Sequence, residues 1–244
     1  DKGYIYVDSY EGLYSVSEER FITQKEADSG DFRDVRELKE KNYFFKMSKY
    51  QSRLIKHIND NPTFIQPEHR RNEVLGFLRS PLEDLCISRP KARLNWGIEI
   101  PFDKKYVTYV WFDALINYVS AIGYQSDEKK YNTFWPVNFH LIGKDILTTH
   151  SVYWPTMLMS AELPLPKSIF AHGWWLSDQT KMSKSLGNVV DPLDLIDSYG
   201  VDPIRFYLMK EMVLGQDANF SMDSFIKCYN SDLANDFGNL LSRV

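Results

Sequence analysis

The chain has 244 residues, enough for one large domain or two smaller domains with a substantial hydrophobic core. Hydrophobic residues make up 43% of the sequence, aromatic residues 15% and charged residues 25%, which is typical of a folded soluble protein and excludes an intrinsically disordered chain. The formal net charge is −4, so any contact with a nucleic acid has to come from a local basic face.

Several features of the sequence predict a cytoplasmic protein. The two cysteines, Cys86 and Cys228, lie far apart in unlike contexts, which favours free thiols in a reducing compartment over a disulfide or a metal site. No apolar run approaches the roughly 18 residues that a membrane span needs. Residues 1–6 lead directly into strand-like alternation and do not resemble a signal peptide. We therefore expect no membrane partner.

The first hundred residues predict a small unit of mixed strands and helices. Short aromatic and β-branched runs predict strands at 4–7, 12–16, 20–22 and 43–45, with a polar stretch from 23 to about 42. Ser48 has the residue type of a helix N-cap. The apolar residues after it recur at four-residue steps and predict one buried helical face: Tyr50, Leu54 and Ile58. A second helix is predicted over 67–80, and 81–102 is predicted to be irregular.

The composition changes near residue 103. The apolar run 106–111 predicts a strand buried on both faces, followed by a helix through Ala114 to Val119. Two further strands are predicted at 139–143 and 169–172, with a helix at 154–160 between them. This alternation predicts an α/β fold with a parallel sheet. After about residue 190 the chain is predicted to be helical, starting at Asp191-Pro192.

A polar segment, 177–188, contains the pentapeptide Lys181-Met182-Ser183-Lys184-Ser185. Serine and Gly187 allow varied backbone angles, so the segment predicts a loop that can move. When ATP activates a carboxylate, negative charge develops on the departing pyrophosphate, and ammonium groups on a closing loop stabilise that charge. Two lysines alone would favour an ordinary solvated loop. The complete pentapeptide, between a predicted strand and a predicted helix, favours the chemical role.

With this pentapeptide the sequence resembles the class I aminoacyl-tRNA synthetases, whose signature loop it is. Within that class it resembles the methionyl enzymes over nearly its whole length. The stretches that carry this resemblance are Tyr10-Glu11-Gly12, Tyr43-Phe44-Phe45, Arg71-Asn72-Glu73-Val74, Val110-Trp111-Phe112-Asp113-Ala114, Ile142-Gly143-Lys144-Asp145-Ile146 and Gly200-Val201-Asp202. Leucyl, isoleucyl, valyl and cysteinyl enzymes share the loop but not this set of flanking stretches.

The resemblance implies part of a methionine–tRNA ligase, which activates methionine with ATP and Mg²⁺ to methionyl-adenylate and transfers it to tRNA(Met). It implies a methionine pocket formed by Trp111, Ala114, Tyr118, Ile146 and His150. It implies ATP binding by Gly143, Asp145, Lys181, Met182, Ser183, Lys184 and Ser185, with Lys181 and Lys184 as the catalytic groups on the phosphates.

Each of these residues also has a purely structural interpretation. Without the family, Trp111 and Tyr118 would favour ordinary core positions, and His150 a hydrogen-bonded structural histidine. The structural alternative for Gly143 and Asp145, which the sequence favours less, is a turn glycine and a helix-capping aspartate. The physical chemistry nevertheless suits the functional interpretation, since a polarizable thioether fits aromatic walls that carry a hydroxyl and an imidazole. A glycine at a strand end allows a ligand to approach, and a carboxylate accepts from ribose hydroxyls.

The resemblance also implies the domain organisation. Residues 1–102 correspond to a connective insertion, 103–190 to the second half of a Rossmann-like catalytic sheet, and 191–244 to a helical contact region that begins the anticodon-binding domain. The second class signature, His-Ile-Gly-His, is not matched by any of the five histidines: His57, His69, His140, His150 and His172. We therefore expect an internal piece of a longer enzyme that is inactive alone.

The insertion departs from the family at its zinc knuckles. Ser15 and Glu18 stand where many members have a Cys-x-x-Cys pair. Serine is a poor zinc ligand and a single glutamate cannot complete a tetrahedral site, so we expect no structural zinc.

Two other functions remain open from the sequence. One is a non-catalytic RNA-binding relative that keeps the sheet but has lost the activation chemistry. The other is a different nucleotidyl transferase of the same fold. The intact lysine pentapeptide disfavours the first, and the set of methionine-pocket residues disfavours the second.

Overall fold

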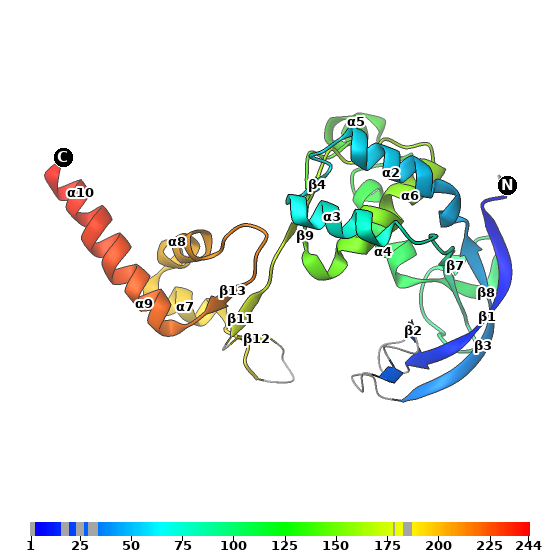
Figure 1. Ribbon diagram of the computed structural model, residues 1–244, viewed down its shortest axis with the longest axis horizontal. Coiled ribbons are helices and arrows are strands. Elements are labelled where there is room, and N and C mark those ends of the chain that lie inside the picture. Colours follow the sequence, from blue (N-terminus) through cyan, green and yellow to red (C-terminus); the bar gives the residue numbers. More distant parts are fainter. Residues whose placement is uncertain (1–2, 16–19, 23–26, 29–33, 178, 183–186) are drawn as a thin grey trace.

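The computed structural model describes residues 3–15, 20–22, 27–28, 34–177, 179–182 and 187–244. The elements form two groups joined by the segment that follows strand β10 (Ile169–His172) (Figure 1). The larger group contains the amino-terminal strands and the parallel sheet. The smaller group, drawn from yellow to red, is mainly helical. No helix among the described residues is long and apolar enough to span a membrane.

The parallel sheet predicted from the sequence is present. Its strand order is β4 (Ile65–Gln66), β10 and β9 (His140–Gly143), and both neighbouring pairs run parallel. Helix α6 (Trp154–Ser160) lies between β9 and β10 in the chain, as predicted. Ile169 pairs with His140 on one side and Ile65 on the other, and it is fully buried. The strands predicted at 139–143 and 169–172 are therefore confirmed.

The prediction for the remaining strand, 106–111, is wrong in two respects: the strand does not belong to the parallel sheet, and it ends at Thr108. Strand β8 (Asp103–Thr108) instead lies in an antiparallel sheet between β6 (Ser88–Pro90) and β7 (Glu99–Ile100). The chain turns at Tyr109, whose carbonyl accepts from the N–H groups of Phe112 and Asp113, and helix α4 (Val110–Ser120) follows. An apolar run alone does not distinguish a strand from the start of a buried helix. The predicted strand therefore ran on into the first residues of α4.

A long antiparallel hairpin replaces several short predicted strands. Strand β1 (Ile5–Ser15) pairs with β3 (Val35–Phe45) along its whole length, and its edges are extended by β2 (Arg20–Ile22) and β5 (Leu85–Cys86). The first seven residues of β3 include five charged side chains, and this charged stretch hid the strand from the sequence analysis. The charges are tolerated because much of the hairpin is exposed, and some pair across it, as Lys39 does with Glu11 at 2.5 Å.

The first two predicted helices are confirmed as α2 (Gln51–Asp60) and α3 (Glu68–Phe77). Leu54 and Ile58 are fully buried, as their spacing predicted. Ser48 is not the N-cap, because a 3-10 turn over Met47–Tyr50 comes first and the Ser48 N–H donates to Asp84 instead. A helix that we did not predict, α5 (Glu128–Phe134), precedes β9.

One hydrophobic core runs through the larger group. It joins residues of α2 and α3 to residues of α4, α6, β9 and β10. The core therefore continues across the predicted boundary at residue 103, and the functional division between 1–102 and 103–190 stays a prediction.

The smaller group confirms the predicted helical region. Its elements are β11 (Trp175–Ser177), β12 (Thr180–Lys181), α7 (Pro192–Tyr199), α8 (Val201–Glu211), β13 (Ala218–Phe220), α9 (Met222–Cys228), a π-helical stretch over Tyr229–Phe237 and α10 (Gly238–Arg243). Asp191 caps α7 by accepting from the Leu193 N–H at 2.8 Å, as the Asp-Pro pair predicted. A small core around Tyr207 and Phe225 holds these helices together.

The two groups meet at close contacts made by two glycines. A Cβ added to Gly173 would lie 2.1 Å from the carbonyl oxygen of Gln216, and one added to Gly215 would lie 2.5 Å from the ring of Pro67. Gly215 also has a positive φ of 91°, which L-residues with side chains rarely adopt. The segment before β13 therefore packs directly against the carboxyl end of the parallel sheet.

Candidate functional site

Helix α4 places three of the predicted pocket residues on one face. Trp111, Ala114 and Tyr118 are separated by three and four positions, so their side chains lie above one another. Leu115 and Val119 face the core and are almost fully buried. The burial of that second face fixes the rotation of α4 and turns the predicted pocket residues towards the segment after β9.

His150 meets Tyr118 from that segment. The Tyr118 hydroxyl lies 2.8 Å from Nε2 of His150, and Nδ1 of His150 lies 3.0 Å from the Ile146 carbonyl oxygen. A carbonyl can only accept, so Nδ1 carries the proton and donates to it. Nε2 of the neutral imidazole then accepts from the Tyr118 hydroxyl. These two hydrogen bonds fix the tautomer and orientation of the ring.

Burial keeps this pair uncharged. His150 is 2% exposed, and burial lowers its pKa, although the hydrogen bond to Ile146 acts in the opposite direction. Burial also raises the pKa of Tyr118. At neutral pH the site therefore presents a neutral hydroxyl and a neutral imidazole, which suits an uncharged polarizable group better than an ionic one.

A second layer behind Tyr118 was not predicted as part of the site. The ring of Tyr118 lies 4.3 Å from that of His140. The indole N–H of Trp154 donates to Nε2 of His140 at 3.2 Å. Burial, together with the neighbouring His150, lowers the pKa of His140 to about 4. No sequence signal pointed to this layer, because His140 lies in a predicted strand and Trp154 in a predicted helix.

Four of the five predicted pocket residues are thus brought together. The ring of Trp111 lies edge-on to His150 at 6.3 Å, and Trp111 and Ile146 are half-buried. Ala114 shares the helical face but is exposed. These residues form one wall of a site that is open on the side of Ala114.

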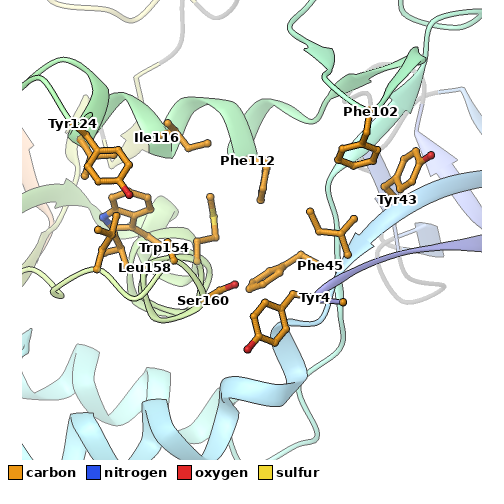
Figure 2. Close-up of a pocket in the computed structure, with 16 residues that line it drawn as sticks. Tyr4, Tyr43, Phe45, Phe102, Phe112, Ile116, Tyr124, Trp154, Leu158 and Ser160 are labelled. Atoms are coloured by element: carbon orange, nitrogen blue, oxygen red, sulfur yellow. The ribbon is translucent and has the colours of Figure 1, made fainter. Parts of the chain in front are cut away.

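An aromatic-lined cavity lies elsewhere and shares only a wall with this site. It has a volume of about 610 Å³ and is lined mainly by apolar and aromatic residues. Figure 2 shows Phe112 pointing from α4 across the cavity towards Phe45 and Tyr4. Trp154 lines this cavity and also contacts Tyr118 at 6.0 Å between ring centroids. The cavity contains none of the predicted pocket residues, so its size does not argue for the methionine site.

The predicted ribose residues lie at the carboxyl end of β9. A Cβ added to Gly143 would lie 2.6 Å from Oδ1 of Asp145, so only glycine leaves that carboxylate in place. Asp145 lies in the one-turn helix Lys144–Ile146 and is exposed. Its Oδ1 accepts from the indole N–H of Trp174 at 3.1 Å. The carboxylate is therefore oriented by the protein and open to a ligand.

Trp174 contacts both Asp145 and Lys181 of the lysine loop. Lys181 lies in β12 and places its ammonium 4.0 Å from the centroid of the Trp174 ring. Met182 is half-buried and packs against the small core around Tyr207 and Phe225. The other predicted loop residues, Ser183, Lys184 and Ser185, lie outside the described residues.

The metal and thiol predictions concern the larger group and α9. Within the described part of the chain, no cluster of three or more His, Cys, Asp or Glu side chains could hold a metal ion. Because Glu18 lies outside that part, the absence of structural zinc stays a prediction. Both cysteines are free thiols, as expected.

Comparison with known proteins decides the family. The family described as tRNA synthetases class I (M) matches residues 29–244. The methionine–tRNA ligase of Clostridium acetobutylicum is 55% identical over 250 aligned residues that include the whole chain. The chain belongs to the methionyl-tRNA synthetases. The methionine–tRNA ligase of Rickettsia conorii is 49% identical to it over 248 residues.

Solved structures of the same family share the fold. Mycobacterium tuberculosis methionyl-tRNA synthetase in complex with methionyl-adenylate matches 99% of the chain with a TM-score of 0.90 and 43% identity. The apo form of that synthetase gives a TM-score of 0.87 and 41% identity over 99% of the chain. The chain covers 49% and 48% of those two structures. It spans 38% of the Clostridium relative and 48% of the Rickettsia relative.

Proposed function

We propose that this chain supplies part of the active site of a methionine–tRNA ligase, which forms methionyl-adenylate from methionine and ATP and transfers the methionyl group to tRNA(Met). The proposal rests on the Tyr118–His150 pair in a chain of this family. The pair is neutral, its hydrogen bonds fix its orientation, and the ring of Trp111 contacts His150 edge-on. Its chemistry matches a side chain that is apolar, polarizable and uncharged.

Methionine recognition would depend on the neutral state of that pair. The neutral Nε2 of His150 already accepts the hydroxyl proton of Tyr118. The lone pairs of the Tyr118 hydroxyl oxygen and the face of the Tyr118 ring can therefore contact a ligand. A charged imidazole would favour an anionic ligand instead. Trp111 and Ile146 supply the apolar contact that would favour the thioether over a shorter polar side chain.

ATP would bind where Gly143 and Asp145 meet Lys181. Asp145 would accept from the ribose hydroxyls, and the missing side chain of Gly143 leaves room for this. Lys181 and Lys184 would stabilise the charge that develops on pyrophosphate as the methionine carboxylate attacks the α-phosphate. Mg²⁺ would arrive with ATP as part of the substrate. Contacts with tRNA(Met) would come from 1–102 and from the helices after residue 190.

The 244-residue chain by itself would be inactive. The His-Ile-Gly-His signature is absent from its sequence, and the relatives are more than twice as long as this chain. The phosphate contacts opposite the lysine loop would have to come from the remainder of such a protein.

The experiment is ATP–pyrophosphate exchange by the longer polypeptide that contains this chain, with methionine compared against leucine, isoleucine and valine. We expect exchange that depends on methionine. Tyr118→Phe removes the hydrogen bond to His150 and should raise KM for methionine about three- to tenfold. Tyr124→Phe is the matched control, since Tyr124 lines the separate cavity and should leave that KM unchanged. Exchange driven by another amino acid would contradict the proposal.

A further inference from the structure

Trp174 connects the two ends of the proposed nucleotide site. Its indole N–H donates to Oδ1 of Asp145 at 3.1 Å, and its ring carries the Lys181 ammonium at 4.0 Å. A carboxylate suited to ribose and a cation suited to phosphate are thus held by the edge and the face of one side chain. Neither the pentapeptide nor the predicted pocket included this residue.

The position of Trp174 is fixed from its backbone. Its N–H donates to Oδ1 of Asp217 at 2.9 Å, and the other oxygen of Asp217 forms an ion pair with Lys144 at 2.6 Å. The hydrogen bond from Lys144 and that from the Trp174 backbone both lower the pKa of Asp217. Gly173, immediately before it, packs against the backbone of Gln216. The indole is therefore anchored where the two groups of elements meet.

The two cations on the ring differ in how they are compensated. The Lys144 ammonium lies 4.2 Å from the ring centroid but is already paired with Asp217. Among the described residues, no carboxylate forms an ion pair with Lys181, so the indole face is the contact that holds its ammonium. Lys181 is exposed, and a cation over tryptophan at an exposed site is favoured by a factor of about two to five.

We propose that Trp174 is a positioning residue that holds the Lys181 ammonium beside the Asp145 carboxylate before ATP binds. The inference rests on the proposed function, because it assigns ribose to Asp145 and phosphate to Lys181. A nucleotide whose ribose binds Asp145 then meets a cation already placed on the phosphate side, and less side-chain entropy is lost on binding.

The first test is limited trypsin cleavage without any ligand, on the longer polypeptide and on the 244-residue chain. Trp174→Leu removes the ring, so cleavage after Lys181 should become about two- to fivefold faster. Trp174→Phe keeps a ring face and should give a rate between the two. Cleavage after other lysines and arginines, followed by mass spectrometry, reports any general loosening. The backbone bond to Asp217 survives both substitutions.

The matched control is Trp96→Leu. Trp96 is 69% exposed and lies in the segment that connects β6 to β7, two strands of a different sheet. This variant should leave cleavage after Lys181 unchanged. An unchanged rate in Trp174→Leu, or an equal acceleration at all sites, would overturn the inference whether or not the protein shows exchange activity.

The second test is ATP–pyrophosphate exchange by the longer polypeptide. Trp174→Leu should lower kcat/KM for ATP about two- to fivefold and leave KM for methionine unchanged. In a Lys181→Gln background the same substitution should have little further effect, because the cation is already gone. Equal losses in both backgrounds would show a merely structural role and overturn the proposal. If the wild type shows no exchange, the proposed function fails, and the trypsin rates alone decide whether Trp174 holds Lys181.

Discussion

Replacing Tyr118 by phenylalanine tests the hydrogen-bonded pair at the centre of the site. The substitution keeps the ring and its contact with His140 and removes only the hydroxyl that donates to His150 at 2.8 Å. Nε2 of His150 is then left without that donor on a side chain that is 2% exposed. An unsatisfied buried acceptor costs about 1–3 kcal/mol.

The half-exposed position of Tyr118 places the expected cost near the lower end of that range. Water can reach the vacated side of the ring and replace part of the lost bond. We expect about 1 kcal/mol, which lowers Tm by about 2–4 °C in a chain of this size. Thermal unfolding followed by circular dichroism at neutral pH measures it.

Tyr131→Phe is the matched control for this prediction. The Tyr131 hydroxyl is buried and has no hydrogen-bond partner among the described residues. Its removal should leave Tm unchanged or raise it, although the chemical change is identical. Equal shifts of Tm in the two variants would refute the reasoning, because they would show that the hydrogen bond to His150 contributes nothing.

Three further predictions follow from the packing and the buried histidines. Gly173→Ala brings a Cβ within 2.1 Å of a backbone carbonyl and should lower Tm strongly, whereas Gly76→Ala, in open space on α3, should raise stability by about 0.5–1 kcal/mol. The folded pKa of His140, about 4, lies below its ordinary 6.5, so the unfolded chain binds more protons and stability falls as pH drops from 6.5 to 4. His140→Gln should remove up to about 3 kcal/mol of that pH dependence in urea titrations. Gly143→Ala, which crowds Asp145, should raise KM for ATP in the longer polypeptide with Tm unchanged.

The sequence predicted the elements whose signals are local. The spacing of Leu54 and Ile58 located the buried face of α2, and the apolar runs 139–143 and 169–172 located the parallel strands. The pocket residues on α4 were predicted through family resemblance, and their helical spacing places them on one face. These features depend on neighbouring residues or on a motif that the sequence contains.

Features that depend on distant partners were missed. Strand β3 was not predicted over its full length because its charged residues form a strand only by pairing with β1. The start of α4 was assigned to a strand because its apolar residues suit either structure. Trp174 could not be predicted as part of the site, since its role follows from contacts with Asp145 and Asp217, 29 and 43 positions away.

Methionine-dependent ATP–pyrophosphate exchange, measured with the 244-residue chain alone and with the longer polypeptide that contains it, distinguishes a partial active site from a complete one. We expect no exchange above background by the chain alone and robust exchange by the longer polypeptide. Adding the remaining part of the protein in trans should restore activity to the chain. Robust exchange by the purified chain would contradict the claim that it holds only part of the active site.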